Sequence, residues 1–385
     1  MIMARVVMST TLVIAATGSA PVYAAAWILS EQASANVGYD DNVRLSTINV
    51  AVATNISSNV SAHWVRQSDA LSWSIDPHLA VIRYTDYSML NHSEEGVVVT
   101  GQQQTERRNS TVSFNWVQDT TLTSELGFTG FSEVNKRHQA SVLTVSQTEQ
   151  WSERFDVQTQ LYAASNRYID AANTGLVNYN YGSAQLSGDY ALTERTQLSL
   201  DSSIGKLQVP GISNYGKTNA SVMLSYSAVF ADRWHAKLSY GPSSVRSERS
   251  NDQGTVYAVN ISRKSATSNL QLAISRDITP TGQGVLTRRQ QFTLSASRAL
   301  SERLSTSITG ILVKNDSQFL TNNLNFYGVR YSDLTANLSW NWTPTLTVSL
   351  SAGHSDQRIE QAARTAMRNH AALNITWSGL ARTLH

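Results

Sequence analysis

The sequence predicts an all-β fold: a transmembrane, antiparallel, up-and-down β-barrel of about 18 strands, within a range of 14 to 18. Three observations predict it. A short turn signature recurs along the chain, the segments between the turns alternate between polar and apolar residues, and the composition is too polar for a helical membrane protein.

The recurrent turn carries an acidic residue followed by arginine. It occurs at Thr105-Glu106-Arg107, Ser152-Glu153-Arg154, Thr193-Glu194-Arg195, Ala231-Asp232-Arg233 and Ser301-Glu302-Arg303, and related tight turns occur at Arg66–Asp69, Arg263–Ser265 and Thr343–Thr345. Neighbouring turns lie about 30 to 47 residues apart, which is room for two strands and one longer loop. The turns therefore predict one rim of a barrel built from hairpins.

The strands predict which face meets lipid. Leu304–Ile311 and Leu346–Ala352 place apolar residues on one face and hydroxyl groups on the other. In a water-soluble barrel of this width, the apolar face would have to fill far more volume than Leu, Val and Ala can occupy. We therefore expect the apolar face outward in lipid and the polar face inward in water.

The N-terminus has the form of a secretory signal. Arg5 precedes an apolar run and small residues ending in Ala24, so we expect residues 1–24 to be a signal peptide cleaved after Ala24. Residues 25–378 form the expected barrel, and residues 379–385 form a short C-terminal tail. No cysteine is present, which excludes disulfides and thiolate chemistry.

The charge and composition limit the classes of partner that the protein can bind. Hydrophobic residues make up 41% of the chain, charged residues make up 15%, and the formal net charge is +2. A near-zero net charge argues against a nucleic-acid binder. We expect a protein of the bacterial outer membrane whose partners are outer-membrane lipid and lipopolysaccharide.

Short turns face the periplasm and long loops face outward in bacterial barrels, so the Glu-Arg rim is expected at the periplasmic side. Aromatic residues test this orientation, because indole rings favour the membrane interface. A periplasmic girdle is predicted from Trp64, Trp73, Trp151, Trp234, Trp340 and Trp342. A second girdle near the outer loops is predicted from Tyr39, Tyr84, Tyr179, Tyr181, Tyr327 and Tyr331.

The last predicted strand, Ala371–Trp377, ends on the aromatic residue Trp377. We expect it to close the barrel against the first strand near Ala33–Tyr39. Outer-membrane barrels commonly end on such an aromatic residue, whereas here Ser378 to His385 continue the chain.

Three short motifs give the chain a family resemblance. Tyr39-Asp40-Asp41-Asn42-Val43-Arg44-Leu45, Arg83-Tyr84 and the repeated Ser/Thr-Glu-Arg turns resemble the outer-membrane proteins called β-barrel porin 2. The resemblance implies an outer-membrane protein often encoded with exopolysaccharide or exosortase systems, and a role in moving polymer or solute. It implies no catalytic residues.

The longest predicted outer loop, Thr121–Arg137, is the best candidate for a segment folded into the lumen. Its charged residues Glu125, Glu133, Lys136 and Arg137 are a predicted pore constriction that screens solutes by charge. The alternative, that these residues only solvate an outer loop or contact lipid phosphates, remains open.

Enzymatic and metal chemistry find little support in the sequence. Only His92-Ser93-Glu94-Glu95 and His138 with Ser141 suggest a nucleophile and base, and neither has a Gly-rich or oxyanion motif beside it. Asp40-Asp41-Asn42 lacks the alternating ligands of a calcium loop. We expect no enzyme, cofactor or specific metal site.

The predicted function is a passive channel or the outer-membrane component of exopolysaccharide or solute export. Its expected partners include a polysaccharide or other hydroxylated solute and periplasmic export components. The alternative is a structural or surface-interaction barrel with a closed lumen, whose function lies in loops such as Asn315–Gly328 and Gln357–Asn369.

Overall fold

The computed structural model describes residues 26–48, 50–129, 135–172, 174–211, 216–231, 233–247, 251–315, 329–359 and 364–384. The predicted signal peptide and Glu133 lie outside these ranges. So do Tyr327, most of Asn315–Gly328 and part of Gln357–Asn369.

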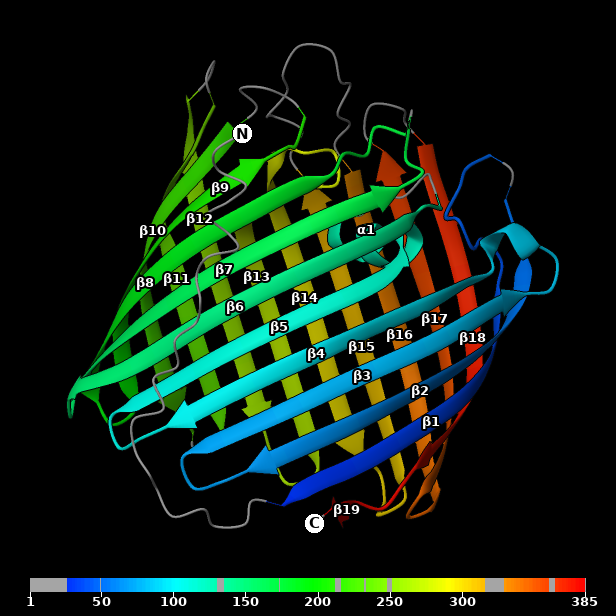
Figure 1. The fold of residues 1–385 in the computed structure, drawn as a ribbon, viewed down its shortest axis with the longest axis horizontal. Coiled ribbons are helices and arrows are strands. Elements are labelled where there is room, and N and C mark those ends of the chain that lie inside the picture. Colours follow the sequence, from blue (N-terminus) through cyan, green and yellow to red (C-terminus); the bar gives the residue numbers. More distant parts are fainter. Residues whose placement is uncertain are drawn as a thin grey trace.

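Within the described residues, eighteen long strands form one closed antiparallel sheet (Figure 1), which confirms the predicted fold class. The strands in chain order are β1 (Trp27–Asp40), β2 (Ala53–Gln67), β3 (Leu71–Tyr84), β4 (His92–Gln104), β5 (Arg108–Thr120), β6 (Arg137–Ser152), β7 (Phe155–Ile169), β8 (Tyr179–Thr193), β9 (Thr196–Gln208), β10 (Gly216–Phe230), β11 (Trp234–Arg246), β12 (Asn251–Lys264), β13 (Ser268–Pro280), β14 (Leu286–Ala299), β15 (Leu304–Asn315), β16 (Val329–Thr343), β17 (Leu346–Ile359) and β18 (Arg364–Ser378).

Helices are few in the described chain. A 3-10 turn, η2 (Ser88–Leu90), lies between β3 and β4, and helix α1 (Thr121–Thr129) follows β5 directly. No helix within the described ranges has the length and apolarity to cross a membrane.

The recurrent turns occupy one rim, as the sequence predicts. Each signature lies where an even-numbered strand returns into the next odd-numbered one, for example Glu153 and Arg154 between β6 and β7. The odd-numbered strands from β1 to β17 return to the next strand through the longer connections at the opposite rim. Every strand up to β18 pairs with its sequence neighbour, which makes the topology up-and-down.

The two faces of the wall have opposite character. Large apolar side chains that alternate along the strands stay exposed on the outer face: Ile56, Val60, Leu79, Leu143, Leu161, Leu186, Leu200, Ile204, Leu224, Leu238, Leu334, Leu350 and Leu373. Between them, Ser187, Ser199, Ser225 and Ser239 are buried on the inner face. Because unpaired backbone groups are costly in lipid, a closed barrel with this outer belt is a membrane-spanning structure.

The barrel closes between β18 and β1, at the place the sequence predicts. Ala33 pairs with Trp377, and Tyr39 pairs with Ala371. The C-terminal tail extends this seam. The Gly379 N–H donates to the Glu31 carbonyl, and the short strand β19 (Arg382–Leu384) pairs with the first residues of β1. The C-terminal tail therefore continues the last strand past an irregularity.

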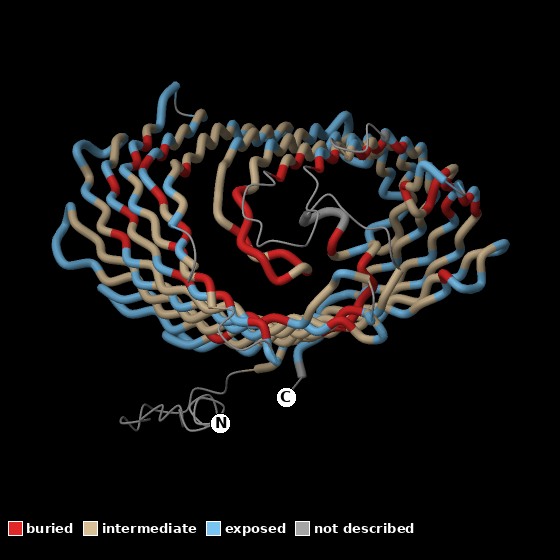
Figure 2. The backbone as a smooth tube through the Cα atoms, turned by 90° about the horizontal axis from the view of Figure 1, so that it is seen from above, coloured by how far each residue is buried: buried red, intermediate tan, exposed pale blue. Residues whose placement is uncertain are grey.

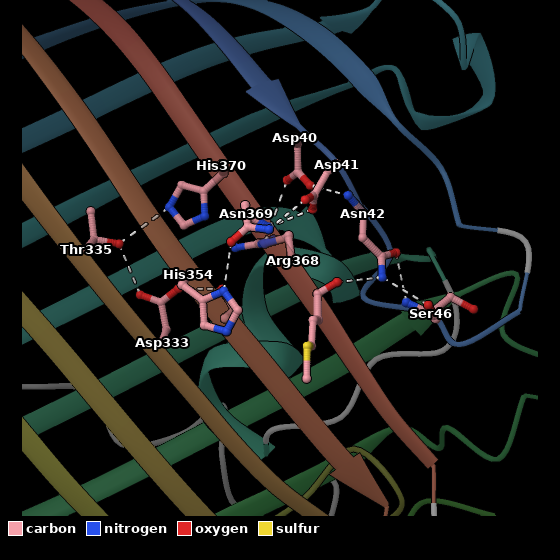
Figure 3. Close-up of polar contacts among 12 residues, drawn as sticks. Asp40, Asp41, Asn42, Ser46, Asp333, Thr335, His354, Arg368, Asn369 and His370 are labelled. Atoms are coloured by element: carbon pink, nitrogen blue, oxygen red, sulfur yellow. Dashed lines mark hydrogen bonds and ion pairs between the residues drawn. The ribbon is translucent and has the colours of Figure 1, made fainter.

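A polar lock holds the same seam at the long-loop rim (Figure 3). The Asp41 carboxylate accepts hydrogen bonds from the Asn369 backbone N–H at 2.6 Å and from its side-chain amide at 2.7 Å. The Asn369 side chain also contacts His354 Nδ1 at 2.8 Å. Residues far apart in sequence are thereby tied together where the first and last strands meet.

The tryptophans named above lie at the short-turn rim. Trp151, Trp340, Trp342 and Trp377 are exposed, and the side chains of Trp340 and Trp342 stack with ring centroids 5.9 Å apart. The alternation of β2, β3 and β11 puts Trp64, Trp73 and Trp234 on the outer face as well.

The predicted tyrosine girdle at the other rim is wrong. Tyr39 is exposed on the outer face, but Tyr179 and Tyr331 are each 5% exposed and lie inside the barrel. Tyr84 and Tyr181 fall on the inner face by strand alternation. The sequence pattern misled because a tyrosine suits a lumen wall that is packed by loops as well as it suits a lipid interface.

The seam lock gives a first prediction. Asp41→Ala removes both hydrogen bonds from Asn369 and should lower the free energy of unfolding by about 1 kcal/mol, since the pair is partly solvated. The measurement is the temperature at which the folded band is lost in semi-native electrophoresis. An unchanged transition would show that strand pairing alone closes the seam.

The same lock should depend on pH. Partial burial raises the pKa of Asp41, but the two hydrogen bonds from Asn369 outweigh it and hold the pKa below its ordinary value. A lowered pKa stabilises the fold above the unfolded value of about 4 and loses that effect as pH falls through the folded value. The difference between the wild type and Asp41→Ala should therefore shrink below about pH 4.

Candidate pore constriction

The β13–β14 hairpin leaves the barrel wall near its tip. Pairing between β12 and β13 ends at Tyr257 and Arg276, whereas β13 and β14 pair on to Pro280 and Leu286. On the other side, β14 meets β15 only from Arg289 onward. Residues 277–288 consequently pair only with themselves, and the tip folds into the lumen (Figure 2).

Apolar packing holds the hairpin tip inside the barrel. Leu286 is 0% exposed and packs in a cluster with Tyr168, Tyr179, Leu207, Val209 and Val245, which come from β7 to β11 or the loop after β9. We call these six residues the lumen cluster. Burying one such side chain contributes about 1.5–3 kcal/mol, so the cluster fixes the hairpin firmly against this wall.

An ion pair and a tight turn complete the hairpin. Arg288 of β14 forms an ion pair with Asp252 of β12, at the level where β12 has lost its pairing with β13. A carbon atom added at Gly254 would lie 2.5 Å from the Arg288 guanidinium carbon, so glycine makes room for this arginine. Gly284, at a φ of +72°, forms the turn that glycine favours.

Helix α1 is the second segment inside the barrel. It lies in the lumen, and it contacts β15 on the far wall as well as β5 and β6 beside it (Figures 1 and 2). Its Thr123 hydroxyl donates to the Glu94 carboxylate of β4 at 2.6 Å. Leu122 packs against the buried cluster of Val43, Ala53 and Leu90.

The two inward segments meet at Gly282. A carbon atom added there would lie 2.6 Å from the Tyr168 hydroxyl, 2.8 Å from a Glu125 carboxylate oxygen and 2.9 Å from Leu176. The Gly282 carbonyl accepts the Val177 N–H at 2.8 Å, and the Tyr168 hydroxyl donates to Glu125. The hairpin tip, α1 and the β7–β8 loop thus join into one cross-lumen structure.

The structure separates the three described residues of the predicted constriction. Glu125 lies inside the barrel at this junction, but it is only 7% exposed. Lys136 lies at the base of the loop, where its N–H bonds to the Thr121 hydroxyl. Arg137 is exposed and alternates with buried His138, which puts its side chain on the outer face. Glu133 is outside the described residues.

The two suggestive catalytic groupings are not assembled. His92 and Ser93 are neighbours on a strand, so their side chains leave opposite faces of β4. His138 faces inward and contacts Asp119 at 2.8 Å and Asn166 at 3.0 Å, whereas Ser141 lies on the outer face of β6. Neither pairing can serve as a nucleophile and base.

The Asp40-Asp41-Asn42 segment is occupied by protein partners. Asp40 faces Arg368 and accepts the Asn42 N–H at 2.9 Å, and the Asn42 amide donates to the Ser46 and Met367 carbonyls. These contacts order the β1–β2 loop. Among the described residues, no group of three or more acidic, histidine or cysteine side chains could hold a metal.

Carboxylates outnumber cations on the described inner face. The inward carboxylates are Asp40, Asp76, Glu94, Asp119, Asp156, Asp189, Asp201, Asp252, Asp277 and Asp333, and the inward Lys and Arg side chains are Lys217, Lys237, Lys264, Arg288, Arg289 and Arg368. Asp156 and Asp189 stand directly opposite each other on β7 and β8, and Asp201 lies on β9 beside them. This patch makes the lumen wall locally negative.

The sequence gives one weak indication that the tip of the β13–β14 hairpin lies in the lumen. Because long connections are expected to face outward, the position and glycines of Thr279–Thr287 predict an outer loop. That prediction is wrong, since the segment folds into the lumen. Val285 and Leu286 are the signal, because adjacent apolar residues are rare in a solvated loop.

Comparisons with known proteins identify the fold. No protein-family model and no curated protein matches the sequence. The solved structure of OccK2 from Pseudomonas aeruginosa is similar over 93% of this chain and 98% of its own, with a TM-score of 0.50 and 9% identity. OccK2 in complex with glucuronate gives a TM-score of 0.50 at 10% identity, with the same coverage.

A third structure, the outer membrane protein OpdK from Pseudomonas aeruginosa, covers 92% of this chain and 99% of its own, at 10% identity and a TM-score of 0.46. At these identities the likeness shows the fold alone. Together with the lipid-facing belt, the fold shared with OccK2 confirms the predicted outer-membrane barrel. The resemblance to β-barrel porin 2 finds no matching family model.

The cross-lumen structure predicts how the pore responds to shortening. Replacing residues 122–135 by a short Gly-Ser linker removes α1 while leaving β5 and β6 paired. Single-channel conductance in planar bilayers should rise, because less of the lumen is filled. Conductance equal to that of the wild type would show that α1 does not limit the pore.

Leu286→Ala tests the anchor of the hairpin. The side chain is fully buried, so truncation should cost about 2–5 kcal/mol of local packing and let the tip move. We expect more frequent transitions between conductance levels in single-channel records. Leu350→Ala, on the lipid face of β17, is the matched control and should leave the records unchanged.

Proposed function

We propose that the protein is a passive outer-membrane channel for small hydrophilic solutes, with a preference for cations and a constriction formed by α1 and the β13–β14 hairpin. The cross-lumen junction at Gly282 carries the proposal. It narrows a barrel whose strand number otherwise gives a wide aqueous lumen.

The preference for cations rests on how the inward charges are partnered. Asp252 and Asp277 face Arg288 and Arg289, and Asp40 faces Arg368, so these carboxylates are compensated. Asp156, Asp189 and Asp201 form no ion pair with a described cation, and Asp201 accepts a hydrogen bond from Ser225 at 2.9 Å. Uncompensated carboxylates in a confined lumen attract cations and repel anions.

The OccK2 structure in complex with glucuronate holds an anionic sugar. The acidic patch on β7 to β9 disfavours such a ligand here. We therefore expect cationic and neutral solutes to enter and glucuronate to be disfavoured, although the barrel is similar.

Export of an exopolysaccharide is a more specific alternative, which the family resemblance suggests. A polymer threading the lumen would have to displace the hairpin, whose tip is buried in the lumen cluster. A structural barrel with a closed lumen is the other alternative, and stable conductance would exclude it. The geometry supports small solutes over both.

The proposal is tested by the reversal potential across a planar bilayer with a KCl gradient. The wild type should show a permeability ratio of K⁺ over Cl⁻ above unity, and Asp156→Asn with Asp189→Asn should bring the ratio closer to unity. Glu194→Gln with Glu302→Gln makes the same change of charge on the short turns and is the control.

Two outcomes would contradict the proposal in different ways. A folded barrel without conductance would exclude the channel. A conducting barrel with a preference for Cl⁻ would keep the channel but reject the role given to the inner carboxylates.

A further inference from the structure

Basic side chains gather on the outer face of the long-loop rim. Each lies within two residues of a strand end that meets a long loop, is exposed, and alternates with a neighbour on the inner face: Arg83, Arg137, Arg167, Lys206, Arg246, Arg330 and Arg358. The rim therefore presents cations toward the membrane around much of the barrel.

Three cations stand side by side on β15, β16 and β17. Lys314 pairs with Arg330 in the strand register, and Arg330 pairs with Arg358. Residues directly opposite each other on neighbouring strands have Cβ atoms about 4.5–5.5 Å apart, and like charges in such pairs destabilise a sheet. An external anion would relieve this repulsion.

Arg330 and Arg358 form no ion pair with any described residue. Asp356, the nearest outward carboxylate along β17, instead accepts a hydrogen bond from Ser332. The guanidinium groups of this pair are therefore available to a ligand from outside the chain.

Some outward arginines of the opposite rim have partners within the chain. There Arg108 forms an ion pair with Glu149 at 3.4 Å, and Arg263 lies over the Trp234 ring at 5.6 Å from its centre. Arg66 and Arg298 of that rim form no ion pair with a described residue, so they are matched controls for Arg330 and Arg358.

The height of the pair fits the headgroups of that leaflet. Along β16, twelve residue steps separate Trp342 from Arg330. At about 3.3 Å per residue and a tilt of about 40°, these steps span roughly 30 Å along the membrane normal. The apolar band of such barrels is about 25 Å tall, so Arg330 lies just beyond it.

We propose that Arg330 and Arg358 bind the phosphate groups of the phosphorylated glycolipid in the outer leaflet, the lipid A part of lipopolysaccharide. Guanidinium groups bind phosphate bidentately through paired N–H donors. The site lies on the lipid-facing side of the wall, so it is independent of the channel.

The test compares purified barrels in detergent for protection against thermal unfolding by added lipopolysaccharide. The wild type should gain stability as the lipid is titrated, and Arg330→Gln with Arg358→Gln should need at least about tenfold more lipid for the same gain. Arg66→Gln with Arg298→Gln removes two exposed cations at the other rim and should behave like the wild type. Arg330→Lys with Arg358→Lys should retain part of the protection, which separates lost charge from misfolding.

Lipid A without phosphate groups and inorganic phosphate alone identify the ligand. Neither should protect the wild type as lipopolysaccharide does. If dephosphorylated lipid A protected equally well, phosphate would not be the group that is bound. If inorganic phosphate protected equally well, the ligand would not be a lipid. Unchanged protection of the glutamine variant would overturn the site.

Discussion

The width of the barrel is the constraint on which the rest of the structure depends. Closing a sheet of this many strands removes its open edges, but it encloses more volume than wall side chains can fill. The wall must therefore turn its apolar face to lipid. The interior is then filled by water and by segments that leave the wall, namely α1 and the hairpin tip at 277–288.

Because these segments enter the lumen, the protein has two separate apolar regions. The outer belt, with residues such as Leu200 and Leu350, meets lipid, whereas the lumen cluster around Leu286 is shielded by the wall itself. Polar residues on the inner wall lie between them. The hairpin tip is held by packing, by the Arg288–Asp252 ion pair and by the hydrogen bond from Val177 to Gly282 rather than by strand pairing with the wall. It is therefore the part of the lumen most open to change by mutation.

The fold also separates the charges that nearly cancel in the sequence. Carboxylates such as Asp156, Asp189 and Asp201 lie on the inner wall, and cations such as Arg330 and Arg358 lie on the outer face at one rim. The net charge of +2 reveals neither the negative inner wall nor the positive outer rim. This separation is a consequence of strand alternation, and it gives the lumen and the rim different ligands to attract.

Strand alternation and turn spacing were enough to predict the barrel, its strand number, its closing seam and the rim that holds the Glu-Arg turns. They could not predict the lumen, because the course of Thr279–Thr287 depends on contacts with Tyr168 and Leu207, which are remote in sequence. Glu125 lies on an inward segment, α1. Its burial against Tyr168 was not foreseeable, since a glutamate in a loop is usually solvated.

The most direct test of the cross-lumen junction is cross-linking in intact outer membranes. The chain has no cysteine, so Leu176→Cys with Gln283→Cys creates one defined pair on the β7–β8 loop and the hairpin tip. A short thiol cross-linker should join them into a faster-migrating band, and a control pair of Gln283→Cys with Ser265→Cys at the other rim should not react in this way. Labelling of both sites without a cross-link would show that the hairpin does not lie across the lumen.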